Sequence, residues 1–155
     1  MNKEHQYQIC LNWTGNLGEG TKTYESYSRD HVISTNHKPQ ILGSADSVFR
    51  GDTFKYNPEE LLLASVSSCH MLWYLHLCAD ENIVVVEYSD NPTGILVVNN
   101  DGGYFKEITL NPSIKIANKE HVGKAIELHI VANKKCFIAN SCNFPIRHFP
   151  KILVI

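Results

Sequence analysis

Alternating apolar and polar positions open the chain and are typical of a half-buried strand. Tyr7, Ile9 and Leu11 alternate with their neighbours in YQICLNWTG, so we expect a first strand there. The segment NLGEG predicts a turn, and residues 21–34 alternate enough to predict a return strand. Residues 35–56 contain only short apolar pieces, and we expect a loop that leads into the next element.

The segment NPEELLLASVSSCHMLWYLHLCA, residues 57–79, is apolar almost throughout and predicts a long helix. Asn57 is a good N-cap and Pro58 fits the first helical position, while acidic residues in the first turn suit the positive end of the helix dipole. We expect the helix to end near residues 80–82. Because nearly every face of this helix is apolar, other elements should enclose it.

The rest of the chain predicts strands and one more helix. Residues 83–117 contain apolar runs separated by Asn-Pro and Asp-Gly-Gly turns, which favours strands. Residues 118–140 predict a second helix capped by Asn118, and residues 144–155 predict a closing strand. The order strand-strand-helix-strand-strand-helix-strand indicates an α+β fold, which we expect to form a single domain over residues 1–155.

Composition and charge exclude several classes of protein. Of the 155 residues, 43% are hydrophobic and 19% are charged, as in ordinary globular proteins, and the net charge of −2 gives no reason to expect binding to nucleic acid or to an anionic membrane. The first 15 residues lack the apolar run of a secretory signal. The apolar run 61–79 includes serines and histidines that are costly in hydrocarbon, so we do not expect it to span a membrane.

The cysteine count points to a reducing compartment. An odd number of cysteines without a secretory signal argues against a disulfide scaffold and favours the cytoplasm, where a functional disulfide is transient. A cysteine at the centre of the apolar helix has two interpretations, a packing residue or a protected nucleophile. The five cysteines are Cys10, Cys69, Cys78, Cys136 and Cys142.

Two motifs give the chain a resemblance to a known family. NPEELLLASVSSC, followed by ANKKCFIANS, resembles the OsmC/Ohr family of thiol peroxidases, and the resemblance extends from WTG at residues 13–15 to the end of the chain. It implies antiparallel sheets wrapped around a long central helix in an intertwined homodimer. It also implies a cytoplasmic enzyme that reduces organic hydroperoxides with a thiol or dithiol reductant, without a metal or an organic cofactor.

The resemblance assigns roles to individual residues. Cys69 matches the peroxidatic cysteine and Cys136 the resolving cysteine. Glu59 matches the acidic residue that the family pairs with a catalytic arginine. Arg50, in FRGD just before the helix, best fits that arginine in the OsmC-like branch, and Arg29 is the reserve candidate.

The proposed chemistry explains why these residue types are needed. A thiolate, not a thiol, attacks a peroxide, and an ordinary cysteine is only a few per cent ionised at neutral pH. Burial opposes ionisation, whereas a nearby guanidinium favours it, and a carboxylate can hold that guanidinium in place. Attack gives a sulfenic acid, a second thiol condenses with it to form a disulfide, and an external thiol reduces the disulfide by exchange.

Helical spacing limits which residues can meet. Glu59 and Cys69 are ten residues apart, which is roughly 15 Å along one straight helix. We therefore expect a site shared across a two-fold interface, or an arginine that bridges the gap. Cys78 lies roughly 13 Å from Cys69 by the same rule, too far for a disulfide, so it is assigned to the core. Cys142 competes with Cys136 as resolving cysteine, and we favour Cys136 because the family usually has an apolar residue at the position of Cys142.

Other interpretations are weaker. His70 and His76 do not share a helical face, and no cysteine or histidine pair has zinc spacing, so no metal site is expected. Six aromatic residues are expected mostly in the core, with some at the entrance to Cys69, which favours organic hydroperoxides over hydrogen peroxide. The alternative function is a non-enzymatic redox sensor or binding module on the same fold, and a purely structural homodimer is a third. The six are Phe49, Phe54, Trp73, Tyr74, Phe137 and Phe144.

Overall fold

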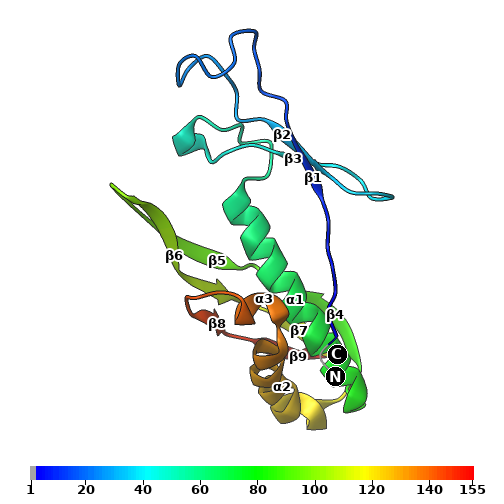
Figure 1. The fold of residues 1–155 in the computed structure, drawn as a ribbon. Helices are drawn as coiled ribbons and strands as arrows, with labels where there is room; N and C mark the ends of the chain where they lie inside the picture. Colours follow the sequence, from blue (N-terminus) through cyan, green and yellow to red (C-terminus); the bar gives the residue numbers. More distant parts are fainter. Residues whose placement is uncertain (1–2) are drawn as a thin grey trace. The chain divides into compact units, whose positions relative to one another are not determined.

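The computed structural model describes residues 3–155. The chain divides into two compact units, Met1–Leu61 and Leu62–Ile155, and each is described by itself. The first unit contains one small sheet and the start of the long helix. The second contains the rest of that helix, two further sheets and the C-terminal helices (Figure 1).

The sheet of the first unit is an antiparallel meander. It has the order β1 (Cys10–Trp13), β2 (His31–Ser34) and β3 (Ile41–Gly43), and a 3-10 helix, η1 (Ser47–Phe49), follows it. The first strand is confirmed. The third strand was missed in the sequence, where its three residues stand alone among polar and turn-forming residues.

The return strand predicted over residues 21–34 is limited to its last four residues. Residues 21–30 form turns and bends instead, because local side-chain bonds replace a strand ladder. The Ser26 hydroxyl donates to the carbonyls of Gly20 and Thr23, and its oxygen accepts from the Thr23 amide at 3.1 Å. The alternation of tyrosine with polar residues over residues 21–30 therefore belongs to a compact loop and not to a strand.

The long helix α1 (Pro58–Asp80) begins and ends where the sequence predicts. A capping box closes its start, since the Asn57 side chain accepts from the Glu60 amide at 2.8 Å and the Glu60 carboxylate accepts from the Asn57 amide at 3.2 Å. At its end Asn82 is left-handed, with φ of 58°, and the Ile83 amide donates to the Cys78 carbonyl.

Only one stripe of α1 is buried in the chain. Val66, His70, Tyr74 and Cys78 recur every four residues and are fully covered, whereas Leu72 on the opposite side is 63% exposed. Residues 3–155 leave this outer face uncovered, so the enclosure of every face of α1 stays a prediction. Among the described residues, α1 alone is long and apolar enough to cross a membrane, by length and composition only.

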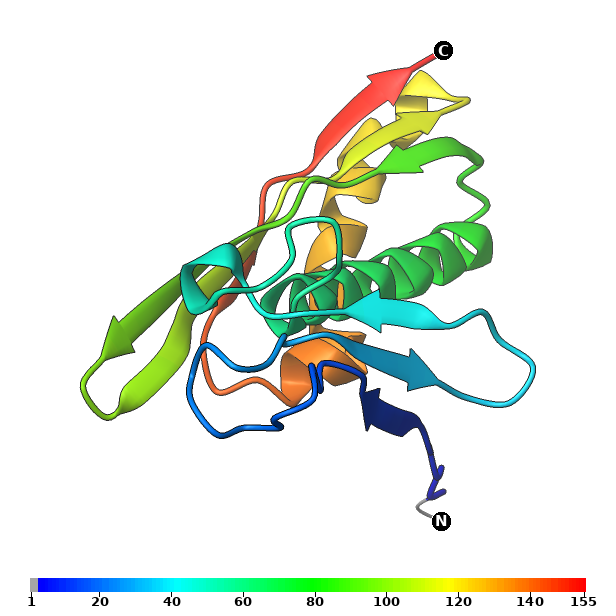
Figure 2. The ribbon, with the colours of Figure 1, turned by 90° about the horizontal axis from the view of Figure 1, so that it is seen from above.

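Two three-stranded sheets form the second unit. One has the order β4 (Val85–Ser89), β7 (Ser113–Ile116) and β9 (Lys151–Val154), which Figure 2 shows side by side. The other has the order β5 (Thr93–Asn99), β6 (Gly102–Leu110) and β8 (Ile146–His148). These elements confirm the α+β class.

The sheets are mixed, which differs from the antiparallel sheets expected. β4 and β5 pair antiparallel to β7 and β6, but β8 and β9 add as parallel strands. The closing strand predicted over residues 144–155 is split between β8 and β9 at Phe149 and Pro150. Proline has no amide proton for a ladder bond. The amides of Phe149 and Lys151 still donate to the Leu110 and Pro112 carbonyls, so the chain passes from one sheet to the other without losing its partner.

The second helix is also divided. It begins as a 3-10 turn, η2 (Lys119–His121), continues as α2 (Val122–Lys135), and resumes as a short helix, α3 (Phe137–Asn140). Asn118 precedes the first turn but makes no side-chain capping bond. Cys136 breaks the helix with an extended backbone, and its sulfur accepts a bond from the Ala139 amide at 3.4 Å. A thiol is therefore the N-cap of α3.

Two apolar clusters hold the second unit together. The larger one joins the inner stripe of α1 to α2 and β7, and its members include Tyr74, Cys78, Ala125, Leu128, Ala132, Ile114 and Ile116. The smaller one joins Val66 of α1 to Ile108 and Leu110 of β6. Both clusters contain residues from the same face of α1. This shared face fixes the rotation of the helix about its own axis. Of the six aromatic residues expected mostly in the core, three are exposed, Phe49 at 38%, Phe54 at 97% and Phe137 at 66%.

Candidate functional site

Cys69 and Cys136 are brought together by the packing of α1 against the break between α2 and α3. Cys136 lies near enough to Cys69 for the two thiols to influence each other's ionisation, and the residues that follow it, Phe137 and Ile138, line one pocket with Cys69. Cys69 is half-buried and Cys136 is fully buried. Burial raises the pKa of the Cys136 thiol to about 11, and the neighbouring Cys69 thiol acts in the same direction. One partner of the pair is therefore accessible and the other is kept protonated behind it.

The remaining cysteines occupy different surroundings, and all five are free. Cys78 is 1% exposed and belongs to the larger cluster, which confirms its assignment to the core. Cys142 is half-buried beside the smaller cluster, and its thiol donates to the Ile138 carbonyl at 3.3 Å. Cys10 lies exposed in β1.

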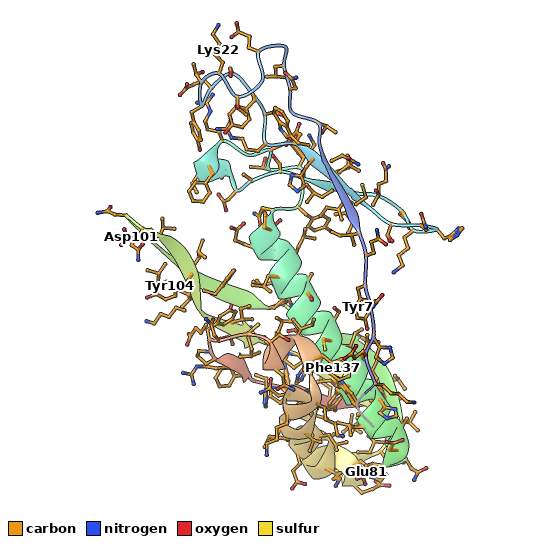
Figure 3. The ribbon with its side chains drawn as sticks, viewed as in Figure 1. Tyr7, Lys22, Glu81, Asp101, Tyr104 and Phe137 are labelled. Carbon is orange, nitrogen blue, oxygen red and sulfur yellow. The ribbon has the colours of Figure 1, made fainter. Side chains whose placement is uncertain are left out.

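An open pocket of about 410 Å³ lies over Cys69 along the outer face of α1. Apolar and aromatic groups dominate its lining, which consists of Ser65, Ser68, Cys69, Leu72, Trp73, His76, Phe137 and Ile138. Phe137, the first residue of α3 (Figure 3), meets the Trp73 ring edge to face at 5.5 Å. The Lys135 ammonium lies 5.2 Å from the centre of the Trp73 ring. The accessible thiol therefore faces a surface suited to an organic group.

The acidic and basic candidates lie in the first unit. Glu59 is in the first turn of α1, and its Oε2 atom is buried without a hydrogen-bond partner among the described residues. Helix α1 is unbroken between Glu59 and Cys69. Burying a carboxylate oxygen without a partner is costly, so this atom calls for a cation or another donor. The pairing of Glu59 with an arginine stays a prediction.

The two arginines differ in how they are held. The Arg29 guanidinium lies 4.1 and 4.3 Å from the ring centres of Tyr24 and Tyr27, and it donates to the backbone carbonyls of both residues. Arg50 follows η1 in the left-handed conformation, with φ of 65°. Its side chain is exposed and has no hydrogen bond or ion pair with any of residues 3–155. Arg50 is thus the free cation of the two, although its role stays a prediction.

A buried histidine cluster is the feature that sequence reasoning missed. His70 of α1 and His129 of α2 are fully buried, and their Nε2 and Nδ1 atoms are 2.9 Å apart. The half-buried ring of His148, from β8, lies 5.6 Å from His70 and 6.2 Å from His129. Tyr74 stacks on His129 at 3.8 Å. In the sequence, the four-residue spacing from Val66 to Cys78 places His70 on the inner stripe, but nothing there links it to His129.

Burial keeps these imidazoles neutral. Desolvation lowers the pKa of His70 to about 4 and that of His129 to about 3, and the neighbouring imidazoles add to both shifts. Desolvation by burial also lowers the pKa of His148. Within residues 3–155, no group of three or more His, Cys, Asp or Glu side chains is placed to hold a metal ion.

Comparison with known proteins identifies the family. The family model described as OsmC-like protein matches residues 50–148, well over half of the chain. The chain therefore belongs to the OsmC-like protein family. No curated protein matches the sequence.

Solved structures agree with this assignment. The chain is 28% identical to an OsmC-like protein of unknown function from Vibrio cholerae, with a TM-score of 0.85 over 95% of this chain and 99% of that one. It is 16% identical to an organic hydroperoxide resistance protein from Legionella pneumophila, with a TM-score of 0.68 over 96% and 98% of the two chains. A protein of the same description from Elizabethkingia anophelis is 17% identical, with a TM-score of 0.66 over 99% and 100%. The last two likenesses show a shared fold.

The histidine cluster predicts a loss of stability in acid. The folded protein keeps His70 neutral down to about pH 4, whereas the unfolded chain takes up a proton near the ordinary pKa of 6.5. Because the unfolded state then binds more protons, the free energy of unfolding should fall as the pH decreases from about 6.5 towards 4. Above about pH 6.5 the histidines should not change the free energy of unfolding with pH. Urea midpoints, followed by tryptophan fluorescence between pH 7.5 and 4.5, measure the effect.

His129→Leu should flatten this pH dependence, because it removes one of the groups that must be kept neutral. His5→Leu, at an exposed terminal position, is the matched control and should leave the pH dependence as in the wild type. Parallel curves for the two variants would contradict the assignment of acid sensitivity to the cluster.

Proposed function

We propose that the protein is a thiol-dependent peroxidase that reduces organic hydroperoxides to alcohols. The observation that carries this proposal is the proximity of a half-buried thiol, Cys69, to a fully buried thiol, Cys136, beneath an apolar pocket. Membership of the OsmC-like family supports it, as does the fold shared with two proteins described as organic hydroperoxide resistance proteins.

In the first step, the Cys69 thiolate attacks one oxygen of the peroxide bond. The O–O bond breaks, sulfur is oxidised to a sulfenic acid, and the other oxygen takes a proton and leaves as the alcohol. The apolar lining of Leu72, Trp73 and Phe137 would bind the organic group of the substrate. Binding energy from that group positions the peroxide for attack.

In the second step, Cys136 resolves the sulfenic acid. Its sulfur forms a bond to the Cys69 sulfur, the S–O bond breaks, and the hydroxide leaves with the Cys136 proton as water. Cys142 is the weaker candidate because its thiol is engaged with the Ile138 carbonyl. An external thiol or dithiol then reduces the disulfide by exchange, which returns both cysteines to their starting state.

Arg50 is proposed as the cation that favours ionisation of Cys69, with Glu59 as the carboxylate that orients it. Two observations within the first unit support this choice over Arg29: the Arg50 side chain is unengaged, and the Arg29 guanidinium already has two aromatic and two carbonyl partners. The buried and unpartnered Glu59 oxygen has the charge that a guanidinium requires.

We further propose that the active form is a cytoplasmic homodimer. Large apolar side chains remain exposed on both units, including Ile9 at 61%, Leu11 at 58% and Leu72 at 63%. Exposed apolar surface of this kind is typical of an interface between copies of a chain. A catalytically competent monomer in solution would contradict this proposal.

Replacement of single cysteines tests the peroxidase function. Cys69→Ser should abolish the consumption of cumene hydroperoxide. Cys136→Ser should still form one equivalent of sulfenic acid, which dimedone traps, but should lose turnover with dithiothreitol. Cys142→Ser, which changes a neighbouring thiol, is the control and should keep most of the wild-type rate. Full turnover by Cys69→Ser contradicts the proposal, and a wild-type protein that oxidises once and stops is a redox sensor.

The arginine assignment predicts a selective loss in the first step. Arg50→Gln should slow the oxidation of Cys69 by at least about 10-fold at pH 7, since the charge that favours the thiolate is removed. The loss should shrink as the pH rises, because hydroxide then ionises the thiol without help. Arg29→Gln serves as the comparison, and a larger effect there would transfer the role to Arg29.

Substrate preference follows from the apolar pocket. The second-order rate constant for cumene hydroperoxide should exceed that for hydrogen peroxide, because only the organic substrate gains from burial against the pocket wall. Phe137→Ala should reduce the preference, since Phe137 contributes exposed aromatic surface to the pocket. Equal rate constants for the two peroxides in the wild type would count against the pocket as the substrate site.

A further inference from the structure

The buried imidazoles come from the same two segments of the chain as the two thiols. His70 follows Cys69 directly in α1, and His129 precedes Cys136 by seven residues, or about two turns, along α2. Helix α1 therefore meets α2 through the imidazole hydrogen bond, and it passes near Cys136, the C-cap of α2, at Cys69. The remaining contacts between α1 and α2 are mainly apolar.

The contact between His70 and His129 is a directional hydrogen bond. The two ring planes are within 11° of each other, and the Nε2–Nδ1 distance of 2.9 Å is that of a hydrogen bond between nitrogens. Both imidazoles are neutral, so a single proton lies between these two atoms. Such a bond holds only over a narrow range of distance and angle, whereas apolar side chains tolerate sliding.

This contact is expensive for a protein core. The outer nitrogens, His70 Nδ1 and His129 Nε2, are buried without a partner among the described residues, as are His148 Nδ1 and the Tyr74 hydroxyl. Each unsatisfied buried polar atom lowers the stability of the folded state, and apolar residues of similar size avoid that loss. Stability alone is therefore a poor reason for the pair, and a requirement for a fixed register between α1 and α2 is a better one.

We propose that His70 and His129 are positioning residues for the condensation of the Cys69 sulfenic acid with the Cys136 thiol. The inference rests on the proposed peroxidase function and deepens its second step. The reaction converts Cys69–SOH and Cys136–SH into a disulfide and water. The S–O bond breaks, an S–S bond forms, and the Cys136 proton leaves with the hydroxide, so no further oxidant is needed.

Geometry makes this step sensitive to register. A disulfide requires the two Cα atoms to lie within about 4.4–6.8 Å and the sulfurs to approach at a defined dihedral angle. A displacement of about 1 Å can cost about 100-fold in rate. The imidazole bond joins α1 to α2, whose C-cap is Cys136, and restrains sliding between the two helices. A slower condensation would also leave the sulfenic acid exposed to a second peroxide, which oxidises it irreversibly to sulfinic acid.

Matched amide variants test the inference. His70 uses its Nε2 atom, which a glutamine amide nitrogen can replace, whereas asparagine is too short to reach it. His70→Asn should slow the formation of the Cys69–Cys136 disulfide by about 10-fold or more and leave the formation of sulfenic acid nearly unchanged. His70→Gln, equally polar and uncharged, should restore disulfide formation to within about 3-fold of the wild type. Stopped-flow fluorescence and dimedone trapping separate the two steps.

Two further variants keep the test decisive. At His129 the order reverses, because that residue uses Nδ1, which asparagine imitates and glutamine does not. His129→Asn should therefore keep the wild-type rate of disulfide formation, whereas His129→Gln should slow it. This pair tests the inference if His70→Asn does not fold. Tyr74→Phe removes another unpartnered group of the same cluster and should leave both steps unchanged. Equal behaviour of the asparagine and glutamine variants, or a parallel fall of both steps, would overturn the inference.

An equilibrium measurement separates this inference from the peroxidase proposal. In glutathione redox buffers, the effective concentration of Cys136 towards Cys69 should fall about 10-fold or more in His70→Asn but not in His70→Gln, with peptide mapping to identify the disulfide. If wild-type Cys69 does not react with hydroperoxides, the peroxidase proposal is contradicted, but the positioning inference can still be tested in the redox buffers. An effective concentration that is the same in both variants defeats the positioning inference alone.

Discussion

The packing of the inner stripe of α1 against α2 is the contact on which the second unit depends. Val66, His70, Tyr74 and Cys78 recur every four residues, so they lie in one line and are buried together. The rotation of α1 that buries this line leaves Cys69 at its border, half accessible to the pocket and near Cys136. The same apolar contact that stabilises the second unit therefore also fixes the orientation of Cys69 on α1.

The break at Cys136 is the second condition for this site. A continuous helix over residues 118–140 would direct the Cys136 side chain by helical periodicity alone. Instead the backbone is extended at Cys136, and the thiol caps α3 through the Ala139 amide. Cys136 thus has a structural role as an acceptor and a chemical role as a buried thiol, and Phe137 is turned out into the pocket immediately after it.

The core of the second unit contains several polar groups as well as apolar side chains. The imidazoles of His70 and His129 and the hydroxyl of Tyr74 lie in or beside the larger apolar cluster, and several of their polar atoms lack partners among the described residues. Such atoms are tolerated where they fix one arrangement among several that apolar packing alone permits. The outer face of α1, by contrast, keeps Leu72 exposed and is still open to a partner.

The sequence by itself determined the elements whose signals are local. Asn57, Pro58 and the acidic first turn predict the start of α1, and the motifs around Cys69 and Cys136 carry the resemblance to the family. Tertiary structure decided the rest: the parallel addition of β8 and β9, the division of the second helix at Cys136, and the meeting of His70 with His129. These features depend on contacts between segments that are far apart in the chain, and a one-dimensional pattern of polar and apolar residues does not specify which buried surfaces face one another.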